Sequence, residues 1–211
     1  MTGRPPTLRR AVPLATLALV TSAAPAQADC GGVVASYPRA WSYSYRPPLV
    51  IGDSTMIFAV PRLAGQKMQA NARGCRQWRE GMDLIRARTR SHSLPHLVVM
   101  ALGANWVITR SDIEATVRLV GPERTLGIVV PREAGGGTSS DAHNVRQAGR
   151  RHPNRVKVLD WPRFSAGHSS WFGGDGLHMT YAGAAAYARY IGTLRPFAAP
   201  PGRAPLVQSR T

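Results

Sequence analysis

The chain has 211 residues, of which 44% are hydrophobic, enough for one globular α/β domain with a core of its own. Its formal net charge is +16, from 27 Lys and Arg residues against 11 Asp and Glu residues. These basic residues are scattered, without the aromatic interleaving of a nucleic-acid-binding module, so we expect no nucleic-acid partner. Two readings of the charge stay open: attraction to an anionic surface or polymer, and a simply solvated, Arg-rich surface.

Residues 1–28 have the pattern of an export signal. Arg9 and Arg10 precede an apolar stretch, which is followed by small residues ending in Ala26-Gln27-Ala28. The stretch of about ten apolar residues is too short to cross a bilayer, which needs roughly 20. We therefore expect cleavage after Ala28 and a secreted protein, extracellular or associated with the cell wall. The alternative is a disordered basic N-terminus.

Cys30 and Cys75 are the chain's two cysteines. In an exported chain, an even pair of cysteines predicts a disulfide. It would close a loop of about 45 residues and stabilise the fold by roughly 4 kcal/mol in the chain-entropy model. Two free thiols are the alternative. Two cysteines without clustered histidines do not make a zinc site, so we expect no metal.

The rest of the chain divides into three parts. Residues 29–47 are rich in Gly, Ser, Tyr and Pro and are expected to be irregular. Residues 48–195 alternate between short apolar runs and helical patterns. The predicted strands are residues 49–51, 66–70, 97–102, 126–130 and 156–159. The predicted helices are residues 78–89, a helix N-capped by Ser111 and ending near Val120, residues 141–151 and residues 180–194. Residues 196–211, with several prolines, are expected to form a mobile tail.

This alternation predicts a parallel sheet with helices on both faces, joined by right-handed crossovers. We therefore expect an α/β protein: a flavodoxin-like, three-layer α/β/α sandwich around a central, mostly parallel sheet of five strands. Open sheets of this kind hold their ligands at the carboxyl ends of the strands. Polar residues that directly follow a strand are therefore the candidates for function.

Two such motifs contain the parts of a nucleophilic serine site. Gly52-Asp53-Ser54-Thr55 follows the first predicted strand, and Asp175-Gly176-Leu177-His178 follows the last one. A serine hydroxyl is a weak nucleophile unless a base takes its proton, and His178 can be that base. Asp175 is close enough in sequence to hold the other ring nitrogen. Taken alone, each motif could also be an ordinary turn before a helix.

Four short blocks occur in the order of a known family: Gly52-Asp53-Ser54, Arg73-Gly74-Cys75, Gly103-Ala104-Asn105 and Asp175-Gly176-Leu177-His178. With them, residues 48–195 resemble the SGNH hydrolase superfamily, also called GDSL-type esterases. The resemblance implies a catalytic triad of Ser54, His178 and Asp175 and no cofactor. It also implies an oxyanion hole made by the backbone N–H groups of Ser54 and Gly74 and the side-chain amide of Asn105.

Two of these positions carry a further expectation. A glycine at position 74 would let the backbone approach a ligand without a Cβ in the way. Trp106, which follows Asn105, is not the Asp or Gly that many family members have there, and it is expected to narrow or line the acyl pocket.

Within the superfamily, the sequence is most similar to the extracellular SGNH domain of peptidoglycan and polysaccharide O-acetyltransferases. The similar points are Met56 after Gly-Asp-Ser, Arg73-Gly74-Cys75-Arg76-Gln77, Asp160-Trp161 and Asp175-Gly176-Leu177-His178-Met179-Thr180. That domain is often joined to an integral-membrane acyltransferase, and we expect no such region here.

The leading hypothesis is therefore a secreted serine esterase. It would hydrolyse an acyl ester, expected to be acetyl, on an extracellular or cell-wall glycan, or on a small ester, and act as a monomer. The first alternative is an O-acyltransferase supplied by a separate membrane acyltransferase partner. The second is a non-catalytic cationic protein that binds the cell wall.

Overall fold

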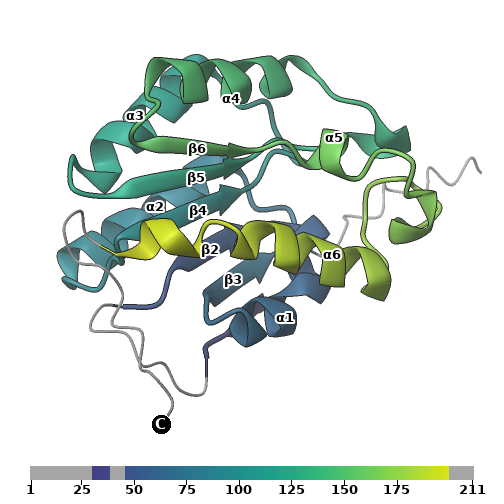
Figure 1. Cartoon of the computed structure of the whole chain (residues 1–211), viewed down its shortest axis with the longest axis horizontal. Coiled ribbons are helices and arrows are strands. Elements are labelled where there is room, and N and C mark those ends of the chain that lie inside the picture. Colours follow the sequence, from purple (N-terminus) through teal and green to yellow (C-terminus); the bar gives the residue numbers. More distant parts are fainter. Residues whose placement is uncertain (1–29, 39–45, 200–211) are drawn as a thin grey trace, which may run out of the picture.

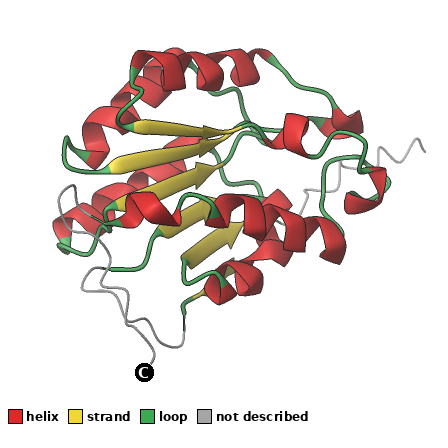
Figure 2. Ribbon diagram, in the orientation of Figure 1, coloured by secondary structure: helices red, strands yellow, loops and turns green. Residues whose placement is uncertain are grey.

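The computed structural model describes residues 30–38 and 46–199. Over these residues it is a three-layer α/β/α sandwich (Figures 1 and 2). Its sheet has six strands in the order β1-β3-β2-β4-β5-β6. The strands are β1 (Val33–Ser36), β2 (Leu49–Gly52), β3 (Gln69–Arg73), β4 (Leu97–Ala101), β5 (Thr125–Val129) and β6 (Val156–Leu159). Strands β2 to β6 are parallel, and β1 runs antiparallel to β3 at one edge.

Helices cover both faces of this sheet. The helices are α1 (Val60–Gly65), α2 (Trp78–Arg90), α3 (Arg110–Val120), α4 (Ser140–Arg151), α5 (Trp161–Phe164) and α6 (Tyr181–Gly192). Short 3₁₀ helices are η1 (Ser54–Ala59), η2 (Ala134–Gly136), η3 (Ser169–Trp171) and η4 (Arg195–Ala198). Helices α1 and α6 share one core with the sheet, and α2, α3 and α4 share the other. In Figure 1 the yellow helix α6 lies across the front of the sheet, with α1 below it.

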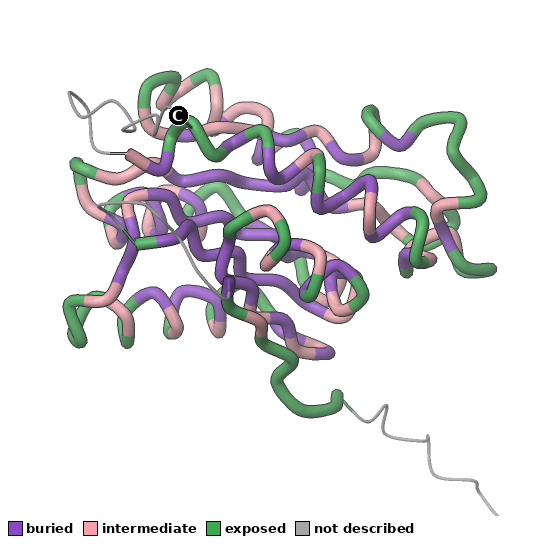
Figure 3. The backbone as a smooth tube through the Cα atoms, turned by 60° about the horizontal axis from the view of Figure 1, so that its bottom comes forward, coloured by how far each residue is buried: buried purple, intermediate pink, exposed green. Residues whose placement is uncertain are grey.

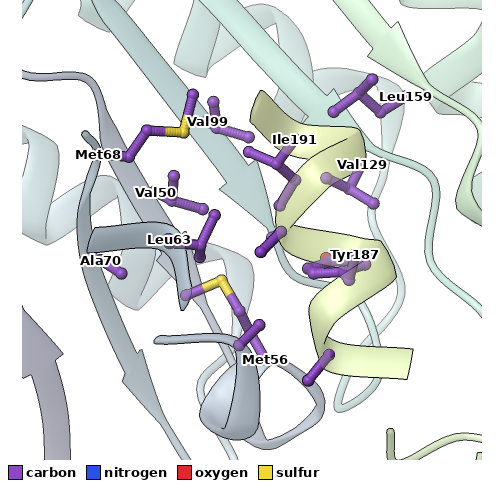
Figure 4. Close-up of a cluster of buried hydrophobic side chains, with 14 of the residues drawn as sticks. Val50, Met56, Leu63, Met68, Ala70, Val99, Val129, Leu159, Tyr187 and Ile191 are labelled. Atoms are coloured by element: carbon purple, nitrogen blue, oxygen red, sulfur yellow. The ribbon is translucent and has the colours of Figure 1, made fainter. Parts of the chain in front are cut away.

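The strands feed both cores because successive side chains of a strand point to opposite faces. In β2, Leu49 and Ile51 pack in the core with α2 to α4, whereas Val50 packs in the core with α1 and α6. Figure 4 shows Val50 and Val99 in this second core, together with Ile191 of α6. Every residue of β2 and β4 is buried, and in Figure 3 the buried residues, in purple, form the inner runs of the tube. This double coverage explains why the strands appear in the sequence as continuous apolar runs.

The sixth strand is a difference from the predicted sheet of five. It lies within residues 29–47, which were expected to be irregular. Val33 and Val34 of β1 are 55% and 38% exposed, so the strand carries no buried hydrophobic pattern for a sequence reading to find. The backbone ladder to β3 holds it instead. The predicted disulfide between Cys30 and Cys75 is confirmed, with a Cα–Cα distance of 5.2 Å, and it anchors the chain just before β1.

Two element boundaries also differ from the prediction. Strand β3 begins at Gln69, after a turn in which Lys67 has a positive φ of 62°. Helix α3 is capped by Thr109, not by Ser111: Thr109 Oγ1 accepts a hydrogen bond from the Asp112 N–H, and the Asp112 carboxylate accepts one from the Thr109 N–H. This reciprocal pair is a capping box shifted by two residues.

The first residues of the predicted mobile tail are ordered, because Arg195–Ala198 forms η4 and Ala198 is buried. The rest of the tail and the predicted signal peptide of residues 1–28 lie outside the described residues. Among the helices that the structure describes, none combines the length and apolarity needed to cross a membrane.

Candidate active site

The candidate nucleophile Ser54 stands where β2 ends and η1 begins. The preceding residue, Asp53, is only 1% exposed and caps η1. Its Oδ1 accepts hydrogen bonds from the N–H (3.0 Å) and the hydroxyl (2.7 Å) of Thr55, and its Oδ2 accepts one from the Ala104 N–H at 3.3 Å. Burial raises the pKa of Asp53. Asp53 therefore ties the nucleophile turn to the block that contains Asn105.

The structure brings the three residues of the predicted triad together, although Ser54 and His178 are 124 positions apart. His178 Nε2 lies 3.0 Å from Ser54 Oγ, and His178 Nδ1 lies 2.5 Å from Asp175 Oδ2. The hydrogen bond to His178 is the main reason that the pKa of Asp175 falls to about 2. Asp175 is therefore a carboxylate at neutral pH, and it favours the imidazole tautomer with hydrogen on Nδ1. That tautomer leaves Nε2 free to accept the Ser54 proton.

The loop that carries Asp175 and His178 is held from two sides. An antiparallel bridge between Phe172 and Met179 closes the loop at its base. Arg132, after β5, donates from Nε to the Gly176 carbonyl at 2.7 Å, and its guanidinium lies 3.9 Å from the centroid of the Phe172 ring. Gly176 has a φ of 67°, a conformation that glycine adopts without steric cost. Sequence reasoning missed Arg132, which looks like any other surface arginine in a strongly basic chain.

Register explains how three separate blocks reach one edge of the sheet. Gly52 of β2 is level with Ala72 of β3 and with Ala101 of β4. Each block follows its strand within a few residues, so Ser54, Gly74 and Asn105 lie at neighbouring strand ends, with β2 in the middle. This is the carboxyl edge of the parallel strands, the position expected for a ligand site.

The Asn105 side chain has a hydrogen-bond donor that is unpaired among the described residues. Its amide nitrogen Nδ2 is buried and has no hydrogen-bond partner within the described part of the chain. Leaving a buried donor unsatisfied costs about 1–3 kcal/mol, so such groups call for a functional explanation. An N–H donor kept free at the edge of the site is what a developing oxyanion requires.

The structure gives Gly74 a reason in addition to the expected approach of a ligand, which stays a prediction. A Cβ built on Gly74 would stand 2.2 Å from the carbonyl oxygen of Cys30, which is backbone and not ligand. The glycine therefore makes room for the N-terminal segment that the disulfide pins against this turn. The Cys30–Cys75 bridge and Gly74 act as one unit that fixes the turn after β3.

Arg76 is a second residue that sequence reasoning did not single out, beyond quoting it within a block. Its side chain is buried, and Nη1 donates to the Gly52 carbonyl at 2.9 Å and to the Asn71 carbonyl at 2.7 Å. Nη2 donates to Asn71 Oδ1 at 2.7 Å. Arg76 thus cross-links the end of β2 to the middle of β3. Burial lowers the pKa of Arg76.

A groove with a volume of about 350 Å³ opens beside the nucleophile. Its lining residues are Ser54, Thr55, Ile57, Phe58, His178 and Met179. Phe58 belongs to this lining because η1 places it on the same short helix as Ser54. Trp106, which was expected to narrow or line the acyl pocket, is 69% exposed and lies outside this groove, so its relation to an acyl group stays a prediction.

Comparison with known proteins is consistent with this geometry. No family model matches the chain. A solved structure, the C-terminal catalytic domain of the Streptococcus pneumoniae peptidoglycan O-acetyltransferase OatA, superposes with a TM-score of 0.59 at 23% identity. The match covers 70% of this chain and 90% of that domain. The chain has the fold of the SGNH hydrolases.

Other proteins agree with the SGNH assignment. A lipase/acylhydrolase from Enterococcus faecalis superposes with a TM-score of 0.55 at 16% identity, over 74% of this chain and all of that protein. In sequence, the chain is 31% identical over 153 residues to the peptidoglycan O-acetyltransferase OatA of Listeria monocytogenes. That alignment covers 68% of this chain but 23% of the relative, so this SGNH domain matches about a quarter of the longer protein.

Proposed function

We propose that this SGNH protein is a secreted serine esterase that removes an acyl group, most simply acetyl, from an extracellular or cell-wall glycan. The observation that carries the proposal is the chain of hydrogen bonds from Ser54 Oγ through His178 to the Asp175 carboxylate. The similarity to proteins named peptidoglycan O-acetyltransferases supports acetyl as the acyl group and a glycan as the alcohol. The export pattern of residues 1–28 supports an extracellular location.

In this mechanism Ser54 Oγ attacks the ester carbonyl carbon while His178 Nε2 takes the hydroxyl proton. The tetrahedral oxyanion is held by the Asn105 amide and by the backbone N–H groups of Ser54 and Gly74. His178 then gives its proton to the alcohol oxygen as the carbon–oxygen bond breaks, which leaves an acyl group on Ser54. Water, deprotonated by His178, attacks this acyl-enzyme, and His178 returns the proton to Ser54 Oγ as the bond to the acyl carbon breaks and the acid leaves.

Hydrolysis and transfer differ only in which hydroxyl attacks the acyl-enzyme. The side chains of His178 and Asp175 are 50% and 46% exposed, so water reaches the base directly. This access favours hydrolysis. The names of the relatives favour the second candidate, O-acetyl transfer to a glycan. In that case we propose that a separate membrane partner supplies the acyl donor. A glycan acceptor that excluded water from this edge would convert the same site to transfer.

The test has two stages. A fluorophosphonate probe should label the wild type and not Ser54→Ala; absence of labelling in both would refute the serine mechanism. The purified protein is then incubated with an activated acetyl ester, with and without a glycan acceptor. Release of acetate without acetylated glycan supports hydrolysis, whereas acetylated glycan supports transfer. Polymer binding that is sensitive to salt and survives His178→Ala, with no ester turnover in either form, would instead indicate a non-catalytic cationic wall-binding protein.

A further inference from the structure

Two exposed aromatic rings lie together beside the candidate nucleophile. Phe58 of η1 and Tyr181 of α6 are 48% and 66% exposed, and their ring centroids are 5.0 Å apart with a tilt of 30°. Arg62 holds the pair from one side: its guanidinium lies 5.5 Å from the Tyr181 centroid, and Nη1 donates to the Phe58 carbonyl at 3.4 Å. We call Phe58 and Tyr181 the aromatic platform.

The platform is joined to the site by short, ordered segments. Phe58 lies four residues after Ser54 on the same 3₁₀ helix, and it lines the groove that Ser54 and His178 also line. Tyr181 follows His178 by three residues, at the first position of α6, after the N-cap Thr180. Large exposed aromatic side chains on rigid elements commonly mark a binding surface. The position of Phe58 and Tyr181 beside Ser54 and His178 therefore favours a role in substrate binding.

The chemistry of the triad decides which half of an ester this groove receives. His178 must protonate the departing alcohol oxygen, so the alcohol has to lie on the imidazole side of Ser54. The groove is lined by His178 and not by Asn105 or Gly74. It is therefore the leaving-group side of the site. An acyl carbonyl oxygen bound by the amide donors would then point away from the groove.

We propose that the aromatic platform is a subsite for a pyranose ring of the alcohol half of the substrate, stacking against the apolar C–H face of the sugar. This inference rests on the proposed esterase function and specifies its substrate. A pyranose offers a flat apolar face edged with hydroxyls, which suits two exposed rings at a half-open groove. An acyl chain is the competing occupant, because the groove lining is mostly apolar.

The experiment compares two acetyl esters that differ only in the alcohol. Methyl 6-O-acetyl-β-D-glucopyranoside contains a pyranose ring that could stack on the platform, whereas ethyl acetate contains no ring. For the wild type we expect a higher kcat/KM on the pyranoside. Phe58→Ala and Tyr181→Ala should each lower the pyranoside to ethyl acetate ratio of kcat/KM about tenfold, mainly through KM. Phe58→Tyr and Tyr181→Phe, which keep a ring at each position, should retain the ratio.

Phe197→Ala is the matched control, because Phe197 is a similarly exposed aromatic residue that follows the far end of α6. Helix α6 has 12 residues and is about 18 Å long, so Phe197→Ala should leave kcat/KM unchanged on both esters. Equal wild-type rates on the two esters, or an unchanged ratio in both platform variants, overturn the subsite. A shift in preference between ethyl acetate and ethyl butanoate instead would assign the groove to the acyl chain. Fluorophosphonate labelling separates the two levels: unlabelled wild type refutes the esterase itself, whereas normal labelling with an unchanged ratio refutes only the platform.

Discussion

Replacement of Gly74 by alanine tests whether the disulfide and the oxyanion turn work as one unit. The new Cβ would stand 2.2 Å from the Cys30 carbonyl oxygen, whereas non-bonded heavy atoms approach to about 3.5 Å. One of the two backbone segments must therefore move by about 1 Å. The disulfide, with its Cα–Cα distance of 5.2 Å, and the β1–β3 ladder resist movement of Cys30. We expect the turn at residue 74 to yield.

The expected magnitude follows from that displacement. A shift of about 1 Å takes the Gly74 N–H out of reach of the oxyanion, and loss of one such donor costs about 2.7–4 kcal/mol of transition-state stabilisation. Gly74→Ala should therefore lower kcat about 100-fold or more, and overpacking should lower the free energy of unfolding by about 1–3 kcal/mol.

The assay is a double-mutant cycle that combines Gly74→Ala with Cys30→Ser/Cys75→Ser. Removing the bridge between residues 45 positions apart should by itself cost about 4 kcal/mol of stability. Without the bridge, the N-terminal segment can swing away from position 74, so the further loss from alanine should be less than about tenfold in kcat. Steady-state hydrolysis of a small acetyl ester and urea unfolding are measured for all four proteins, with circular dichroism to establish that each is folded.

Equal losses from alanine in both backgrounds would refute this reasoning. That result would mean that the glycine serves the approach of the substrate, as the sequence first suggested. A disulfide-free protein with full activity and full stability would equally contradict the bracing role of the bridge.

Three further predictions concern single residues. Asn105→Ala should lower kcat about 100- to 1,000-fold, while urea unfolding shows no loss of stability, because the amide has no partner to lose. Asp175→Asn should lower kcat by about 10⁴-fold, as loss of the carboxylate partner does in other triads, in the steady-state assay. The pKa of Asp175 falls from 3.8 to about 2 in the folded protein. The contribution of the Asp175 carboxylate to the stability of the fold is therefore complete above about pH 4 and is lost as the pH falls from about 4 to about 2. Asp175 is therefore ionised above pH 4, and a stability to urea that falls as steeply between pH 4 and pH 2 in Asp175→Asn as in the wild type would contradict this assignment. Arg76→Met should reduce the free energy of unfolding by about 2–4 kcal/mol, because it leaves buried carbonyls of β2 and β3 unpaired, with partial recovery in Arg76→Lys; unchanged urea midpoints would refute this.

Local patterns were sufficient for four of the five parallel strands, β3 being the exception, and for the Ser54, Asp175 and His178 candidates. The runs at β2 and β4 and in the buried part of β5 are apolar without interruption because helices cover both of their faces, and that burial is recorded in the sequence itself. The residues nominated for the site could be found for a similar reason. Nucleophile, base and amide each lie just after a strand or in the loop before α6, in short motifs with a fixed order.

Only the folded chain decided the features that depend on contacts between distant segments. Strand β1 has exposed side chains and exists through its ladder and the disulfide, so no hydrophobic period marks it. In a chain of charge +16, the sequence does not distinguish Arg76 and Arg132 from solvated arginines. In the folded chain, Arg76 donates to the Gly52 carbonyl at the end of β2, and Arg132 donates to the Gly176 carbonyl in the His178 loop. Phe58 and Tyr181 form a platform only because η1 and α6 meet. The sequence therefore determined which groups could react. Tertiary contacts determined what holds those groups in place and which face of the protein a substrate meets, because local periodicity does not encode contacts between distant segments.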